Sequence, residues 1–275
     1  MPAGVRTLVL IAVVFAALSP ANAKGLRLDG NAVQGGLMIG YVSPGARVYF
    51  EGAEIRLSSE GVFVIGFGRD APATANLQIT FADGSVVDKT LSIEKRRYRI
   101  QRIDGLPERK VTPKPSDLER IRREAAVVRA ARARDDPRTD FLGGFDWPAR
   151  GPISGVYGSQ RILNGEPRRP HFGVDIAAPV GASVRAPAGG IVTLAHPAMF
   201  YSGGTLILDH GHGLSSSFLH LSEILVEEGQ RVRRGDLIAR VGATGRATGA
   251  HLDWRMNWFD TRIDPALLAR GTPKD

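Results

Sequence analysis

The sequence predicts a mainly β protein in which two β-rich regions are joined by a basic helical connector. Short runs of alternating apolar residues, bounded by turn residues, recur through a 275-residue chain that contains 33 glycines and 17 prolines. One segment between them has helical spacing instead. We expect a small antiparallel β-sandwich at residues 24–105, a basic linker with a helix at 106–150, a second β-sheet domain at 151–268 and a tail at 269–275.

Residues 1–23 are typical of a secretory signal peptide. Arg6 supplies a short basic region, residues 8–18 form an apolar run, and Ala21-Asn22-Ala23 is a cleavage site of the A-x-A kind. The apolar run is short for a transmembrane helix, although an uncleaved membrane anchor is the alternative. We therefore expect a mature chain that begins at Lys24, is periplasmic or secreted, and has no stable membrane insertion.

The charge and cysteine content narrow the classes of partner and metal site. The chain has no cysteine, so disulfides and thiolate metal ligands are excluded. Its net charge of +8 suits a polyanionic partner. Because an exported protein rarely meets nucleic acid, a cell wall rich in carboxylates is the expected partner. The alternative is that the basic charge serves only solubility.

The first β-rich region shows strands and turns but no constellation of catalytic residues. Apolar residues alternate at 48–50, 77–81 and 91–93, and Asp83-Gly84 between two such runs predicts a hairpin. The segment 98–103 is expected to be its last strand. Residues 24–105 contain no histidine. We interpret this region as an accessory module that docks, spaces or shields the second domain.

The connector is expected to contain one basic helix. Ser116 and Glu119 have the spacing of a capping box, which predicts that Ser116 caps the helix. A narrow apolar stripe follows at helical spacing, at Leu118, Ile121, Ala125 and Val128. Arginines occupy much of the remaining surface. The stripe favours a helix docked on a neighbouring domain, and a solvated basic arm is the alternative.

Candidate metal ligands occur in two short segments of the second domain. His171 and Asp175 are four residues apart, so in a straight strand they would lie about 13 Å from each other. Ligands of one metal must be closer, and Gly173 between them permits the chain to bend. His251 and Asp253 are two residues apart and would share one face of an extended strand. Imidazole and carboxylate groups are ordinary zinc ligands.

Four motifs occur together in this region, in a fixed order. They are HFGVD at 171–175, DHGHGL at 209–214, SFLHLS at 217–222 and GATGRATGAHLDW at 242–254. In order and spacing they resemble the lysostaphin-type (LytM-like) zinc endopeptidases, over roughly residues 150–268. The resemblance implies a twisted sheet with an active-site groove across one face. It also implies a zinc-dependent endopeptidase that hydrolyses peptide stems or cross-links of bacterial peptidoglycan.

The resemblance also implies a role for each matching residue. His171 and Asp175 match the first two zinc ligands of the family. His220 and His251 match two catalytic histidines beside the metal, which would handle protons and stabilise a tetrahedral oxyanion. The spacing of tight turns also suggests lipoyl and biotinyl carrier domains. Those domains need an attachment lysine, and residues 115–273 contain none.

The chain departs from the family at the third ligand. The usual H-x-H is here His251-Leu252-Asp253, and the glutamate usually found two residues later is Arg255. We expect Asp253 to be the third ligand, because aspartate can bind zinc through oxygen. Pairing of Arg255 with Asp253 is the alternative, and it would leave a site that holds metal poorly. The corresponding alternative function is a non-catalytic protein that binds peptidoglycan or activates another cell-wall hydrolase.

Overall fold

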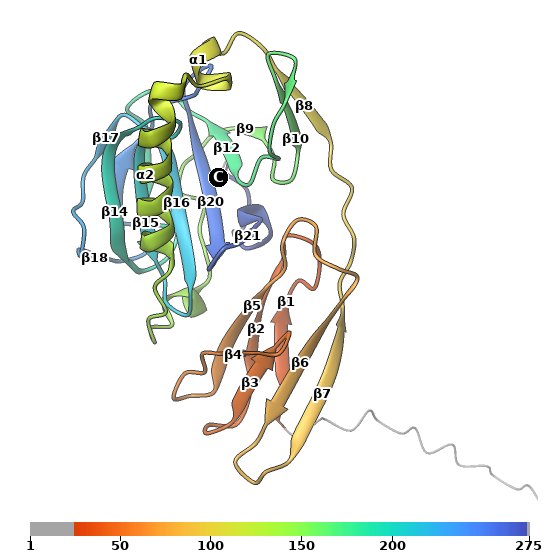
Figure 1. Cartoon of the computed structure of the whole chain (residues 1–275). Helices are drawn as coiled ribbons and strands as arrows, with labels where there is room; N and C mark the ends of the chain where they lie inside the picture. The colour runs from red at the N-terminus through yellow and green to blue at the C-terminus, as the bar shows by residue number, and fades with distance from the viewer. Residues whose placement is uncertain (1–24, 274–275) are drawn as a thin grey trace, which may run out of the picture.

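The computed structural model describes residues 25–273, so the predicted signal peptide lies outside the described residues. The first region consists of two antiparallel sheets that share one core (Figure 1). One sheet has the order β1 (Arg27–Gly30), β2 (Leu37–Tyr41), β5 (Val62–Gly66). The other has the order β4 (Ala53–Ile55), β3 (Arg47–Phe50), β6 (Thr74–Thr80), β7 (Val86–Ser92). The expected antiparallel architecture is confirmed.

Two sequence predictions for this region have different outcomes. The turn at Asp83-Gly84 does join β6 to β7, and Gly84 has the positive φ of 79° that favours glycine. The expected last strand, β8 (Ile100–Ile103), does not pair within the first region. It pairs in parallel with β10 (Gln160–Leu163), which also pairs with β11 (Glu166–Pro167). The chain therefore contributes a strand to the second region on its way to the helices.

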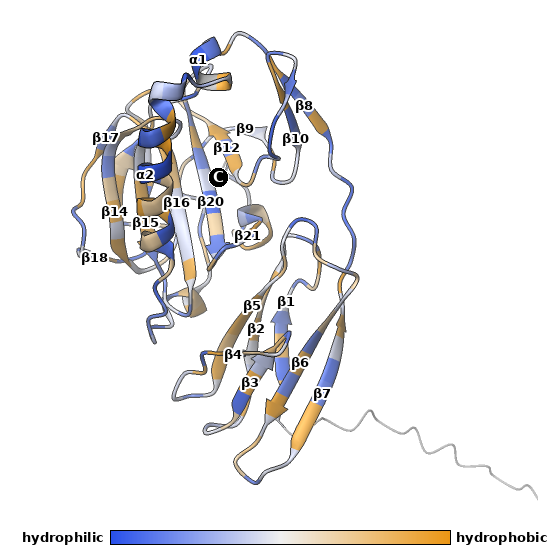
Figure 2. Ribbon diagram, viewed as in Figure 1, coloured by the Kyte–Doolittle hydropathy of each residue, from blue (hydrophilic) through white to orange (hydrophobic). Residues whose placement is uncertain are grey.

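The connector forms the short helix α1 (Glu108–Val111) and then α2 (Pro115–Arg132). The predicted cap at Ser116 is wrong, because proline is well suited to the first helical turn and the helix begins at Pro115. The side chain of Asp117 accepts a hydrogen bond from the backbone of Lys114, in place of the expected Glu119 contact. Figure 2 shows that much of α2 is hydrophilic, as its arginines require.

Helix α2 is docked on the second region. Its inner face packs into a small apolar cluster that consists of Val128, Ala131, Leu194, Met199 and Ile207. The backbone N–H of Phe200 donates to Glu124 Oε2 at 2.7 Å, which ties the middle of the helix to the sheet. The prediction that the basic helix docks on a neighbouring domain is therefore confirmed.

The second region is built on one large sheet with the order β18-β14-β15-β16-β20-β12-β9, and β21 is added to β20. These strands are β18 (Arg231–Val232), β14 (Gly190–Met199), β15 (Gly203–Asp209), β16 (Leu214–Leu221), β20 (His251–Trp258), β12 (Val174–Ala177), β9 (Ile153–Gly155) and β21 (Thr261–Ile263). A small sheet has the order β13 (Ser183–Arg185), β19 (Leu237–Arg240), β17 (Glu223–Ile224). Two short 3-10 turns lie at Asp140–Gly143 and Pro265–Leu267. In residues 25–273, no helix is both long and apolar enough to cross a membrane.

The two regions are in contact through aromatic and charged side chains. The ring of Phe50 packs edge-on against Trp258, with centroids 5.8 Å apart. Arg96 forms an ion pair with the buried carboxylate of Asp264 at 2.8 Å. These contacts place the first region beside the end of β20, the strand that carries two of the predicted site residues (Figure 1).

The pair Gly40 and Phe63 provides a test of the first sheet. They lie opposite each other on β2 and β5, and a Cβ at Gly40 would overlap the buried Phe63 ring. We expect Gly40→Ala to lower the free energy of unfolding by about 1–3 kcal/mol through overpacking. In a Phe63→Ala background the same change should be nearly neutral, because the ring is gone. Urea denaturation of the four proteins measures this coupling, and equal costs of Gly40→Ala in both backgrounds would contradict it.

Candidate active site

The register between β12 and β20 brings the two predicted aspartate ligands together. Asp175 lies directly opposite Asp253, and Ala177 lies opposite His251. The alternating side chains Leu252 and Trp254 point to the other face and are fully buried. Asp175, Asp253 and His251 therefore project from the same side of the sheet.

His171 precedes β12, and the chain bends as predicted so that its ring reaches the same place. Nε2 of His171 lies 3.0 Å from Oδ1 of Asp175. Gly173 is necessary for a reason that the sequence did not reveal. It is not one of the glycines with a positive φ, but a Cβ at this position would overlap Asp253 and Arg255. Its small size, rather than a left-handed backbone, permits the approach.

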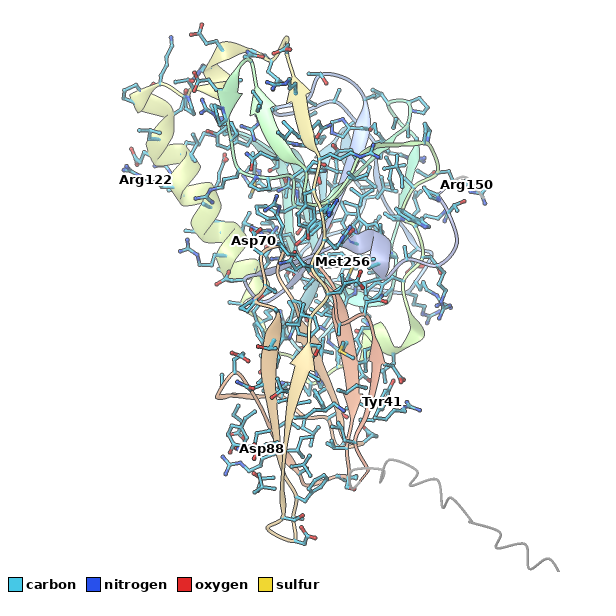
Figure 3. All side chains as sticks on the ribbon, turned by 90° about the vertical axis from the view of Figure 1, so that its right-hand side faces the viewer. Tyr41, Asp70, Asp88, Arg122, Arg150 and Met256 are labelled. Carbon is cyan, nitrogen blue, oxygen red and sulfur yellow. The ribbon has the colours of Figure 1, made fainter. Side chains whose placement is uncertain are left out.

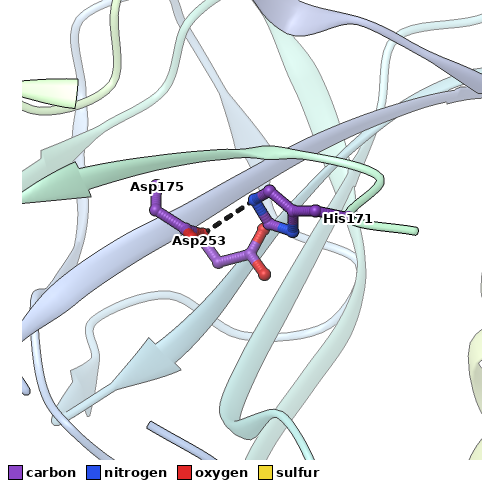
Figure 4. Close-up of side chains that lie close together, drawn as sticks. All are labelled: His171, Asp175 and Asp253. Atoms are coloured by element: carbon purple, nitrogen blue, oxygen red, sulfur yellow. Dashed lines mark ion pairs between the residues drawn. The ribbon is translucent and has the colours of Figure 1, made fainter. Parts of the chain in front are cut away.

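His171, Asp175 and Asp253 form a compact buried cluster (Figure 4). Each offers one potential ligand atom, and these atoms all lie within 4.8 Å of one another. Both ring nitrogens of His171 and Oδ1 of Asp175 are buried without an aligned hydrogen bond. Buried polar atoms normally have partners. Atoms that lie close together without the alignment of a hydrogen bond are placed to bind one further atom between them. The nitrogen and oxygen donors match those that zinc accepts.

Each carboxylate of this cluster is hydrogen-bonded to one arginine. Nη2 and Nε of Arg255 lie 2.6 and 3.0 Å from the two oxygens of Asp253, and Nη2 of Arg161 lies 2.8 Å from Oδ2 of Asp175. Burial alone would raise the pKa of Asp253, but attraction to Arg255 and His171 holds it well below its usual range. Burial alone would also raise the pKa of Asp175, but attraction to His171 and Arg161 lowers it. Both carboxylates are therefore ionised at neutral pH.

His220 and His251 lie beside the cluster with their ring centroids 4.7 Å apart. Nδ1 of His220 lies 2.8 Å from the carbonyl of Thr244, and Nδ1 of His251 lies 2.9 Å from the carbonyl of Gly249. A carbonyl can only accept, so each Nδ1 donates and each neutral ring keeps an unprotonated Nε2. Burial lowers the pKa of His220 to about 4, which keeps this ring neutral at pH 7.

The backbone at His220 is unusual for a residue at a strand end. Its φ is 65°, in a region that non-glycine residues rarely adopt, and its N–H donates to the carbonyl of Ser202 at 2.7 Å. Such strain is often found at functional sites.

The other histidines lie apart from the cluster. His210 is fully buried, with its ring nitrogens bonded to the carbonyl of Gly189 and the hydroxyl of Ser216, which is a structural role. His212 lies in the turn after β15. His196 lies within β14, which extends as far as Met199.

Sequence reasoning missed Arg161, which approaches the cluster from β10. It lies outside all four motifs, and its distance from His171 in the sequence carries no signal. Only the fold shows that β10 lies close enough for its guanidinium to reach Asp175. The alternative pairing of Arg255 with Asp253 was foreseen and is present.

Comparisons with known proteins identify the family and the fold. The model of "Peptidase family M23" matches residues 169–265. A crystal structure described as an M23 peptidase from Pseudomonas aeruginosa is 33% identical, covers 86% of this chain and 94% of that chain, and superposes with a TM-score of 0.68.

Two curated relatives are the peptidoglycan DD-endopeptidases ShyB and ShyA of Vibrio cholerae. They are 45% and 39% identical over 124 and 106 residues, which is 44% and 38% of this chain. The matches span only 26% and 21% of the length of these relatives. The match to the solved structure, in contrast, extends over nearly the whole of that protein. From its motifs, its fold and this similarity, we conclude that the chain belongs to peptidase family M23.

Proposed function

We propose that this chain is a zinc-dependent endopeptidase that hydrolyses peptide stems or cross-links of bacterial peptidoglycan. The observation that carries the proposal is the buried cluster of His171, Asp175 and Asp253, beside two histidines of fixed tautomer. Within the cluster, both nitrogens of His171 and Oδ1 of Asp175 lack an aligned hydrogen bond. The names of the Vibrio cholerae relatives support peptidoglycan as the substrate class. A cell-wall substrate and the basic charge both suit a protein of the cell envelope.

His171, Asp175 and Asp253 would hold the metal. A bound zinc ion supplies a Lewis acid that polarises the scissile carbonyl and makes water a nucleophile at neutral pH. Arg161 donates a hydrogen bond to Oδ2 of Asp175, and Oδ1 of the same carboxylate lies beside His171. Arg255 donates to both oxygens of Asp253, but Oδ1 accepts only from Nε and keeps a second lone pair. The two arginines therefore orient the carboxylates, as groups behind metal ligands commonly do.

The two remaining histidines have the properties that proton transfer requires. The carbonyls of Thr244 and Gly249 hold His220 and His251 with Nε2 able to accept a proton. Once protonated, either ring can donate to a leaving amine or to a developing oxyanion. Such general acid–base catalysis typically contributes about 10²–10⁴ in rate.

A second candidate function has one observation in its favour. The two contacts of Arg255 neutralise Asp253 without any metal. A chain in which this pair replaces a metal ligand would bind peptidoglycan, or activate another hydrolase, without cutting peptide bonds. The ring of His171 opposes this alternative, because neither of its buried nitrogens makes an aligned hydrogen bond, although Nε2 lies 3.0 Å from Oδ1 of Asp175.

Metal content separates the two functions. We expect the purified full chain to bind about one zinc ion, because the site resembles three-ligand catalytic sites. Asp253→Asn should weaken zinc binding at least tenfold, because it removes a charged ligand yet still accepts from Arg255. His196→Ala, outside the cluster, is the matched control and should bind zinc like the wild type. Equilibrium dialysis with elemental analysis measures all three, and wild-type protein that binds no more zinc than Asp253→Asn would support the non-catalytic function.

The division of roles among the histidines can be tested separately. We expect His220→Ala and His251→Ala each to lower the release of soluble fragments from purified peptidoglycan by about 10²–10⁴. Zinc content should stay near that of the wild type, because neither ring is needed as a ligand. If both variants lose zinc as well as activity, the histidines are ligands and the proposed roles are wrong.

A further inference from the structure

A cavity of about 300 Å³ lies between helix α2 and the face of the large sheet, and it reaches His220. Its charged lining residues are Arg132, Arg161, Arg246, Arg255, Arg262 and Glu124. Arginines thus outnumber acidic residues by a wide margin. Apolar side chains, among them Ile121 and Val128 of α2, complete the lining. Such a mixture suits a ligand with a negatively charged end and an aliphatic body.

Two of these arginines have no acidic partner. Arg132 is only 9% exposed; its Nη2 donates to the neutral hydroxyl of Ser217 at 2.9 Å, and its Nε has no hydrogen bond. Arg262 donates to the neutral side-chain oxygen of Asn257 at 3.0 Å. Within residues 25–273, neither guanidinium lies within ion-pair distance of a carboxylate. The attractions of the exposed Asp260 and of the buried Asp253, which is already paired with Arg255, act from farther away.

The electrostatics of this pair are unfavourable in the absence of an anion. Burial, followed by repulsion from Arg262 and Arg255, holds the pKa of Arg132 well below its usual range. Burial and repulsion from Arg255 lower the pKa of Arg262 to about 10. Burying like charges without a counter-ion destabilises a protein. An arrangement that costs stability is therefore expected to serve binding.

We propose that this cavity binds a carboxylate of the peptide substrate through Arg132 and Arg262, with the scissile amide placed beside His220. The proposal rests on the proposed function, because it assigns a recognition element to the same site. Guanidinium groups match carboxylates in shape and form strong charge-assisted hydrogen bonds. The carboxylate can belong to a side chain or to the end of a peptide stem, and both place the same chemistry in the cavity.

The test measures binding by calorimetry, with the full chain stripped of metal so that no hydrolysis occurs. The probes are a purified peptidoglycan stem peptide and derivatives amidated at the side-chain carboxylates, at the terminal carboxylate, or at both. We expect the free acid to bind about tenfold or more tightly than the fully amidated peptide, because charged hydrogen bonds are stronger than neutral ones. The two singly amidated peptides identify which carboxylate is bound.

Variants locate the preference in the cavity. Arg132→Gln and Arg262→Gln should each reduce the preference for the free acid to less than threefold. Arg122→Gln is the matched control, because Arg122 is exposed on the same helix (Figure 3). It should keep the full preference. Loss of the preference in all three variants would indicate a general effect of net charge and would overturn the proposal.

A stability measurement distinguishes binding from a structural role. Arg132→Gln should melt at the same temperature as the wild type or higher, because it removes a buried like charge. A marked fall in melting temperature would make Arg132 a structural residue and contradict the proposal. Wild-type protein that cleaves peptidoglycan but binds acid and amide equally would refute the carboxylate site alone. A clear preference without any cleavage would instead refute the proposed enzyme.

Discussion

The antiparallel register of β12 and β20 is the constraint on which the site depends. It sets Asp175 directly opposite Asp253, although like charges at such positions repel each other. The register is held because Leu252 and Trp254 fill the core on the opposite face of β20. A slip of one residue would turn those apolar side chains to the opposite face and would turn Asp253 into the core. The stability of the core therefore maintains an electrostatically unfavourable pair, which positive charge must compensate.

Positive charge is supplied from two separate parts of the chain. Arg255 comes from β20 itself and Arg161 from β10. The strand β10 in turn pairs with β8, which arrives from the first region. The position of one guanidinium at the site is thus linked to the path of the chain between the two regions. This linkage gives the first region a structural connection to the site despite its lack of catalytic residues.

Helix α2 forms one wall of the cavity that reaches His220. Val128 and Ala131 of the helix pack against β14 and β15, while Arg132 in its last turn donates to Ser217 on β16. The guanidinium is therefore held among other arginines, where repulsion and burial both oppose its charge. A helix that was only a spacer would not need a buried arginine at this position. The similarity to the solved Pseudomonas aeruginosa structure covers 86% of this chain, so the fold that they share extends beyond the second region.

The β architecture, the hairpin at Asp83-Gly84 and the family could be predicted from the residues alone, because alternation, turn residues and motif order are local properties. The motifs also identified His171, Asp175 and Asp253, which the structure brings together. The sequence did not determine the pairing of β8, the start of α2 or the approach of Arg161. Those features depend on contacts between residues far apart in the chain, and only the packing of strands and helix decides which distant side chains meet.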